Sequence, residues 1–271
     1  MENKPPKYFE MIYIDELSSY SDPELRAMGF SQDGPCDKHK QIMSETPVHL
    51  NKSSVQRLVD ECDSYMPPPP ENDSLETLAE LYKVYERNSA SSLSDHDSMK
   101  KYHGLEMPQL FADTLKGWGY DPSIQELSDL LFDAEIVCLN IQYKYNRPRP
   151  YQLAEYYGMP LNIVTNKDMD SPSYPCLEHV QAALLALRCG QYVNFKRKKE
   201  LVKLTAQVAR AKLMGACNFP SDTSLSLVLA THIFGATSFG EKARVKETYR
   251  QNRKLNRRKN KSRAYNRRTH K

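Results

Sequence analysis

The sequence predicts an all-α protein, and two observations carry this prediction. Apolar residues recur at the three- and four-residue spacing of amphipathic helices over most of residues 67–240. No segment of useful length alternates apolar and polar residues as a half-buried strand does. We therefore expect an all-α body over residues 67–240, with a partly irregular N-terminal extension over 1–66 and a basic tail over 241–271.

The helices are delimited by residues that favour helix ends. Ser123 with Glu126, and Asp73 with Glu76, have the spacing of a capping box. The stretch KYNRPRP at residues 144–150 ends the longest helix, because a residue before proline avoids the helical conformation. The predicted helices are 55–62, 75–87, 107–118 (ended by Gly119), 123–144, 152–157, 175–192, 196–214 and 220–234.

The most informative stretch is Ser171–Ala182, which reads SPSYPCLEHVQA. Pro175 suits the first turn of a helix, where its missing N–H is not needed. The apolar positions from Leu177 to Leu187 then fall on one face of that helix. Because a turn that leads into a helix N-terminus is a natural anion site, this stretch is a candidate phosphate cradle.

The composition argues against several classes of protein. No run approaches the roughly 18 apolar residues that a membrane span needs. The N-terminal MENKPPKYFE lacks the apolar core of a secretory signal peptide. The six cysteines are scattered without a CxxC pair, which argues against zinc and favours reduced thiols. We expect a protein with no membrane span, no metal and no cofactor.

Three motifs occur in an informative order. A long helix runs into Asn-Arg-Pro-Arg-Pro at 146–150, a Ser-Tyr-Pro turn at 173–175 opens the next helix, and Asn-Phe-Pro-Ser-Asp occurs at 218–222. Their order and spacing resemble the type 2 phosphatidic acid phosphatase and vanadium haloperoxidase superfamily, in particular its soluble acid-phosphatase branch. The resemblance covers about residues 67–236, and the proline-rich segment from Pro67 is similar to one in phage-encoded members.

The resemblance implies a helical bundle with a phosphate-transfer site. In the family, one Lys and two Arg hold phosphate oxygens by charge-assisted hydrogen bonds. A Ser hydroxyl and a Gly amide complete the cradle. One His protonates the leaving group, and a second His, oriented by an Asp, attacks phosphorus.

This chain keeps few of those groups. Arg149 matches the family's first Arg-Pro arginine, and Asp222 keeps the position of the orienting Asp. The other matching positions hold Gln142 for the Lys, Cys176 for the Ser, Leu177 for the Gly, Glu178 for the acid His, Lys212 for the second Arg and Asn218 for the nucleophilic His. Arg149 and Lys212 are thus the remaining candidates for phosphate binding.

Such a site does not suit the family's reaction. Asn218 has no basic lone pair with which to attack phosphorus, and the Leu177 side chain stands where backbone should approach the anion. An ionised Glu178 would repel a negative charge ~4 Å away by about 4 kcal/mol at an effective dielectric near 20. We predict a vestigial site with no intact catalytic residue. The alternative is a divergent phosphomonoesterase that uses Glu178 and His179 in new roles.

Each of these residues also has a structural interpretation. Arg149 could cap the preceding helix or pair with a carboxylate. Glu178 and Asp222 suit the first turn of a helix, where acids complement the helix dipole. Asn218 is favoured as a helix cap over any ligand role, and Cys176 as a small buried thiol over a nucleophile.

The C-terminal tail carries the positive charge. Residues 242–271 hold fourteen Lys or Arg and one acid, a net +13, which leaves −9 for the rest of a chain whose total is +4. Such a tail binds nucleic-acid backbones without sequence preference, docks on an acidic protein surface, or stays solvated or near an anionic membrane. The candidate contact residues are Arg253, Lys254, Arg257, Arg258, Lys259, Lys261, Arg263, Arg267 and Arg268.

Together these observations predict a non-catalytic protein on a phosphatase-like scaffold. We expect a viral structural or interaction protein, in the host cytoplasm or the virion. Nucleic acid, an acidic protein surface, virion proteins and a second copy of the chain remain open as partners.

Overall fold

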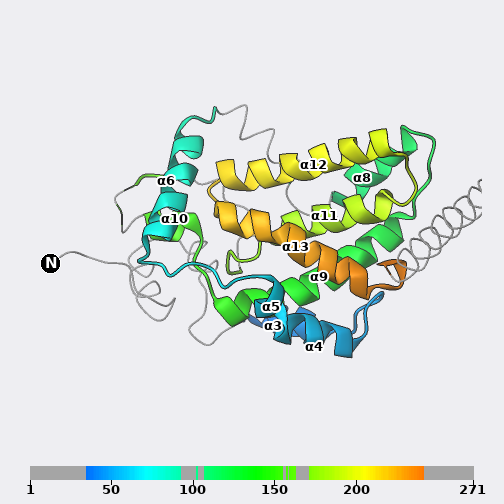
Figure 1. The fold of residues 1–271 in the computed structure, drawn as a ribbon, viewed down its shortest axis with the longest axis horizontal. Helices are drawn as coiled ribbons and strands as arrows, with labels where there is room; N and C mark the ends of the chain where they lie inside the picture. The colour runs from blue at the N-terminus through cyan, green and yellow to red at the C-terminus, as the bar shows by residue number, and fades with distance from the viewer. Residues whose placement is uncertain are drawn as a thin grey trace, which may run out of the picture.

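The computed structural model describes residues 35–92, 102, 107–154, 157, 159–162 and 171–240. All regular elements in these ranges are helices, which confirms the all-α fold class (Figure 1). They are α3 (Asp37–Ser44), α4 (Lys52–Asp60), α5 (Cys62–Tyr65), α6 (Leu75–Ser89), α8 (Met107–Lys116), α9 (Ile124–Tyr145), α10 (Pro150–Ala154), α11 (Leu177–Cys189), α12 (Phe195–Met214) and α13 (Pro220–Ala236). No helix in these ranges is both long enough and apolar enough to span a bilayer.

The bundle is organised around α11, which packs against α8, α9, α12 and α13 (Figure 1). Val180 and Leu184 of α11 are fully buried in the largest core cluster, together with Val137 of α9 and Leu229 of α13. A second cluster joins α11 to α8 and α12 through residues such as Leu185 and Phe111. The largest cluster holds α11 against α13, and the second holds α11 against α8 and α12.

Helix α9 begins and ends close to the predicted residues. The Ser123 side chain accepts a hydrogen bond from Glu126 N at 3.2 Å, as expected of a cap. The helix ends at Tyr145, and its C-cap residue Asn146 has φ 50°. Asn tolerates this left-handed conformation better than most residues, so the chain leaves the helix one residue before Arg147 and its prolines.

The N-terminal extension is more regular than predicted, because residues 37–65 form the helices α3, α4 and α5. Helices α3 and α4 pack on α9. Asp133 of α9 is buried and accepts the backbone N–H groups of Val48, His49 and Leu50 at 2.6–3.0 Å. These tertiary contacts hold a segment whose own sequence has weak helical periodicity. Residues 1–34 lie outside the described residues.

Three predicted helix starts shift in the structure. Ser74, rather than Asp73, caps α6 by accepting from Thr77 N at 3.1 Å. Helix α11 begins at Leu177, so Pro175 precedes the helix instead of lying in its first turn. The predicted turn at 152–157 is α10, which begins at Pro150 and ends at Ala154. Pro220 does occupy the first turn of α13, as predicted.

Candidate functional site

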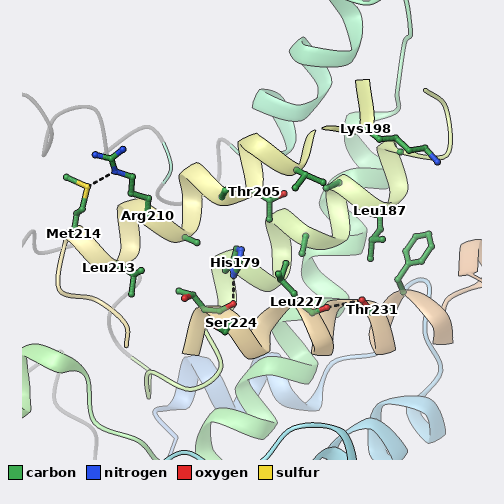
Figure 2. A pocket seen from close by; sticks show the side chains of 18 of the residues that line it. His179, Leu187, Lys198, Thr205, Arg210, Leu213, Met214, Ser224, Leu227 and Thr231 are labelled. Carbon is green, nitrogen blue, oxygen red and sulfur yellow. Dashed lines mark hydrogen bonds between the residues drawn. The ribbon is translucent and has the colours of Figure 1, made fainter. Parts of the chain in front are cut away.

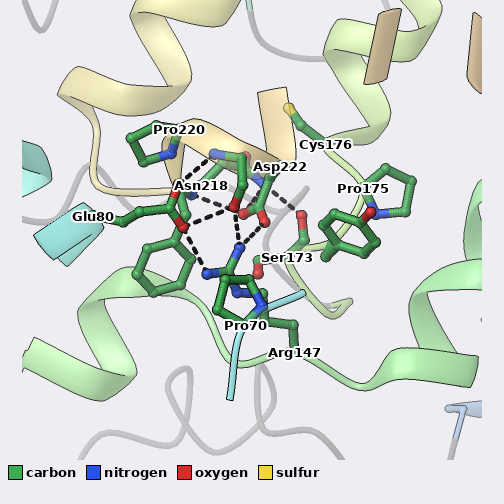
Figure 3. Close-up of polar contacts among 12 residues, drawn as sticks. Pro70, Glu80, Arg147, Ser173, Pro175, Cys176, Asn218, Pro220 and Asp222 are labelled. Carbon is green, nitrogen blue, oxygen red and sulfur yellow. Dashed lines mark hydrogen bonds and ion pairs between the residues drawn. The ribbon is translucent and has the colours of Figure 1, made fainter. Parts of the chain in front are cut away.

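The motif-bearing segments meet where the N-terminal ends of α11 and α13 lie side by side (Figure 3). Hydrogen bonds to main-chain carbonyl groups hold this region together. Ser173 N donates to Arg147 O at 2.9 Å, Ser173 Oγ donates to Pro148 O at 2.9 Å, and Cys176 N donates to Asp222 O at 3.3 Å. The region contains a group of side chains that we call the polar cluster, all buried except the partly exposed Glu80: Glu80, Arg147, Arg149, Glu178, Lys212, Asn218 and Asp222.

Arg147 is the centre of the first half of the polar cluster. Its Nη1 donates to Asp222 Oδ1 at 2.5 Å and to Ser221 Oγ at 2.7 Å, and its Nη2 donates to Glu80 Oε2 at 2.9 Å (Figure 3). The guanidinium also lies 4.0 Å from the centre of the Phe219 ring. With a side chain only 1% exposed, Arg147 joins α6 to the start of α13 through two carboxylates.

Asp222 is held from two sides. Its Oδ2 accepts Phe219 N at 2.7 Å, which caps the start of α13. Burial raises the pKa of Asp222, and the charge of Arg147 opposes that shift. In this chain the Asp222 carboxylate is therefore oriented by an arginine and a backbone amide, and it orients no histidine.

The second half of the polar cluster is an ion pair between Lys212 of α12 and Glu178 of α11. Both side chains are almost completely buried. Burial on its own opposes ionisation of Glu178, but the charges of Lys212 and Arg149 outweigh it and lower the pKa of Glu178. Burial also opposes charge on Lys212, and Glu178 raises its pKa. The pair is thus ionised on both sides at neutral pH.

The Arg149 guanidinium donates hydrogen bonds to backbone carbonyl groups. Nε donates to Ser171 O and Nη1 to Cys217 O, both at 2.9 Å, and Nη2 lies 3.4 Å from Ser171 Oγ. The Arg149 backbone N–H donates to Gln152 Oε1 at 2.7 Å. Arg149 therefore fastens the loop before α11 to the loop before α13, instead of capping α9.

The two amides lie between these charged groups. Gln142 Nε2 donates to Pro175 O at 2.9 Å, and Asn218 Nδ2 donates to Ser173 O at 2.7 Å. Asn218 Nδ2 is also 3.5 Å from Asp222 Oδ2. Because Phe219 precedes α13 as its N-cap residue, Asn218 is not the helix cap that the sequence suggested. Both amides hold the backbone of the turn before α11.

Cys176 and Leu177 differ in their surroundings. The Cys176 thiol is buried 3.7 Å from Glu178 Oε2, and burial raises its pKa well above the ordinary value, which does not suit a nucleophile. Leu177 is partly buried and packs on the largest core cluster. The neighbouring His179 donates from Nδ1 to Thr223 O at 2.6 Å, and burial lowers its pKa.

The structure therefore gathers the positions that the motif order singled out. Arg149, Cys176, Glu178 and Lys212 form one group, and Asn218 and Asp222 form another with Arg147. Glu80 and Arg147 were missed as site residues. Arg147 belongs to the Asn-Arg-Pro-Arg-Pro motif and could have been noticed, but nothing in the sequence connects it with Glu80. Within the described residues, no group of three or more His, Cys, Asp or Glu could hold a metal ion.

Comparison with known proteins adds no family to these observations. The chain matches no family model, and no curated protein matches it in sequence. The fold and the site define an all-α protein with a buried network of ion pairs at the ends of two helices. The resemblance to acid phosphatases stays a prediction based on the motif order. The nine candidate contact residues of the tail lie outside the described residues.

Proposed function

We propose that the chain is a non-catalytic protein on a phosphatase-like helical scaffold. The observation that carries this proposal is the engagement of the cations in the polar cluster by protein groups. Lys212 is paired with Glu178, Arg147 with Asp222 and Glu80, and Arg149 with two backbone carbonyls. The groups that would hold a phosphate in an active relative hold the protein together here.

Phosphate binding would have to break these contacts. An anion at Lys212 would displace the Glu178 carboxylate, which is buried and would be left without its partner. Removing one partner from a buried ion pair typically costs about 3–5 kcal/mol. The site also lacks a nucleophile, because Asn218 is an amide whose nitrogen donates to Ser173 O. Both considerations favour a structural role over the alternative of a divergent phosphomonoesterase.

Purified protein is expected to hydrolyse p-nitrophenyl phosphate no faster than buffer. Millimolar phosphate or vanadate is expected to cause no change in melting temperature that depends on Arg149, because the polar cluster offers no unengaged cation. Rates of hydrolysis and thermal melts of the wild type and of Asn218→Ala check this. Hydrolysis that Asn218→Ala abolishes, or a phosphate-induced shift that Arg149→Lys abolishes, would favour the phosphomonoesterase instead.

For the positive role, we infer an interaction or structural protein of a virus that uses its basic tail. The support is the charge distribution: a net +13 over residues 242–271 beside −9 on the rest of the chain. Such a tail favours a polyanion through release of bound counterions and has no base-reading module beside it. Nucleic acid is the first partner to test, and an acidic protein surface is the second.

Full-length protein is expected to bind duplex DNA of unrelated sequences equally well, and the affinity should fall steeply with salt. Each phosphate contact adds about −0.9 to the slope of log affinity against log salt concentration. Changing all nine candidate tail residues to Gln should flatten that slope and remove most binding. Changing the exposed Lys196, Lys199 and Lys203 of α12 to Gln is the control. Binding of polyglutamate but not DNA would favour the acidic protein partner, and binding of neither would contradict the proposal.

A further inference from the structure

A large cavity lies between α11, α12 and α13, and no residue of the polar cluster lines it (Figure 2). Its volume is about 1030 Å³, at the upper end of the range for small-molecule sites. Helices α12 and α13 both pack on α11, and side chains of α11 line the cavity between them (Figure 2). The lining runs along α12 from Lys198 to Met214, about 24 Å at 1.5 Å per residue. The cavity is therefore long.

The cavity is lined mainly by apolar side chains. Small residues such as Ala183 and Ala186 line it on α11, and Ala206 and Ala209 line it on α12. Larger apolar residues stand at the mouth and remain exposed to solvent: Leu187 by 37%, Val202 by 63% and Leu227 by 47%. Three exposed apolar side chains from three helices around one hollow indicate a surface that an apolar molecule would cover.

One end of the cavity is cationic. Arg87 and Arg210 both line it beside Met214. Asn88 Nδ2 donates to Met214 O at 2.8 Å, which brings the end of α6 to this place, and Arg210 Nε lies 3.3 Å from Met214 Sδ (Figure 2). In the part of the chain that the structure describes, neither arginine has a carboxylate partner. Two such arginines favour an anion, and a carboxylate suits the guanidinium geometry.

The charge of one polar side chain in the interior, His179, bears on which ligand the cavity can bind. His179 lines the cavity midway along it (Figure 2), and its Nδ1 donates to the Thr223 carbonyl. A carbonyl only accepts, so Nδ1 carries the proton, and burial lowers the pKa of the ring. The neutral ring adds no charge to the middle of the cavity. An uncharged chain is therefore compatible with the interior, and the charged end is confined to the arginines.

We propose that this cavity binds a linear aliphatic carboxylate, with the chain along α11 and the carboxylate between Arg87 and Arg210. The proposal goes beyond the non-catalytic role of the polar cluster and does not depend on it. Lys198 at the opposite end is a single exposed cation. It offers no bidentate geometry, so the arginine end takes the carboxylate.

The test uses the full chain and dodecanoate below its micelle concentration, measured by titration calorimetry. We expect saturable binding of one molecule per chain. Arg87→Ala with Arg210→Ala should weaken it about tenfold or more, because charge-assisted hydrogen bonds to the carboxylate are lost. Ala206→Trp should weaken binding, because the indole ring would obstruct part of the cavity. Position 206 is exposed, so the variant should fold, which its melting temperature checks.

Lys203 provides the matched controls, because it is exposed on α12 and does not line the cavity. Lys203→Ala removes a charge, and Lys203→Trp adds the same ring, and neither should change the affinity for dodecanoate. Dodecanol, the neutral counterpart, should bind more weakly than dodecanoate. Equal affinity for the alcohol, or unchanged affinity in the double arginine variant, overturns the anion assignment. Absence of binding, or an affinity that Ala206→Trp leaves unchanged, overturns the site.

Discussion

Lys212→Met is expected to lower the free energy of unfolding by about 3–5 kcal/mol, because it leaves the Glu178 carboxylate buried without a partner. Lys212 is 1% exposed and Glu178 is 7% exposed at the side chain, so water does not replace the lost ammonium group. Chemical denaturation followed by circular dichroism measures the loss. Lys203→Met on the same helix is the matched control, since Lys203 forms an exposed pair with Glu200. Such pairs contribute about 0–1 kcal/mol.

A second substitution separates the ion pair from simple packing. Glu178→Leu in the Lys212→Met background removes both charges, and apolar replacement of a buried pair is often neutral or stabilising. We therefore expect the double variant to recover most of the lost stability. If the double variant is as unstable as Lys212→Met, the loss comes from packing or from other contacts of Lys212, and the ion-pair explanation is wrong.

The pair also predicts a dependence on pH. The folded-state pKa of Glu178 is lowered from an ordinary value of 4.5. As the pH falls below that value, the unfolded chain takes up the proton first, so the stabilisation from ionised Glu178 is present above pH 4.5 and is lost in acid. The stability of the wild type relative to the double variant should decline over that acidic range. A constant difference would contradict the assigned direction of the pKa shift.

The sequence predicts the fold where the signals are local. Ser123 with Glu126 marks the start of α9, and Pro220 marks the start of α13, because caps and first-turn prolines act within one helical turn. The sequence did not predict helix α3, because its residues are mostly polar and tertiary contacts with α9 stabilise it. Its His39 is buried and lies 2.7 Å from the hydroxyl of Tyr143 on α9. Tertiary contacts of this kind leave no periodic pattern in the sequence.

For the site, residues could be singled out from the sequence, but their pairing could not. Motif order brought Arg149, Glu178 and Asp222 to attention, and the structure places all three at the adjoining ends of α11 and α13. What the sequence could not show is which charges pair. Lys212 meets Glu178 from 34 residues away, and Arg147 meets Glu80 from 67 residues away. Such pairings depend on how whole helices pack, and they decide whether a cation is available to a ligand.

Arg147→Met is expected to have at least as large an effect as Lys212→Met, about 3–5 kcal/mol, because two carboxylates lose their partner at once. Arg147 Nη1 bonds Asp222 and Nη2 bonds Glu80, so one planar guanidinium serves both. Arg147→Lys should recover only part of the stability, since an ammonium group cannot reproduce the planar guanidinium that donates to both carboxylates. Denaturant titrations of the three proteins measure these differences. Lys144→Met is the control three residues earlier, where the pair with Asp63 is exposed.

Neutralising the two acids distinguishes a charge effect from a packing effect at Arg147. Glu80→Gln and Asp222→Asn, added to Arg147→Met, remove the unpaired charges while keeping the side-chain shapes. The triple variant should therefore regain part of the lost stability. Some loss should remain, because Phe219 N and Ser221 N still need acceptors, and neutral amides accept more weakly than carboxylates. A triple variant no more stable than Arg147→Met would show that the Phe219 ring contact, and not the ion pairs, makes Arg147 important.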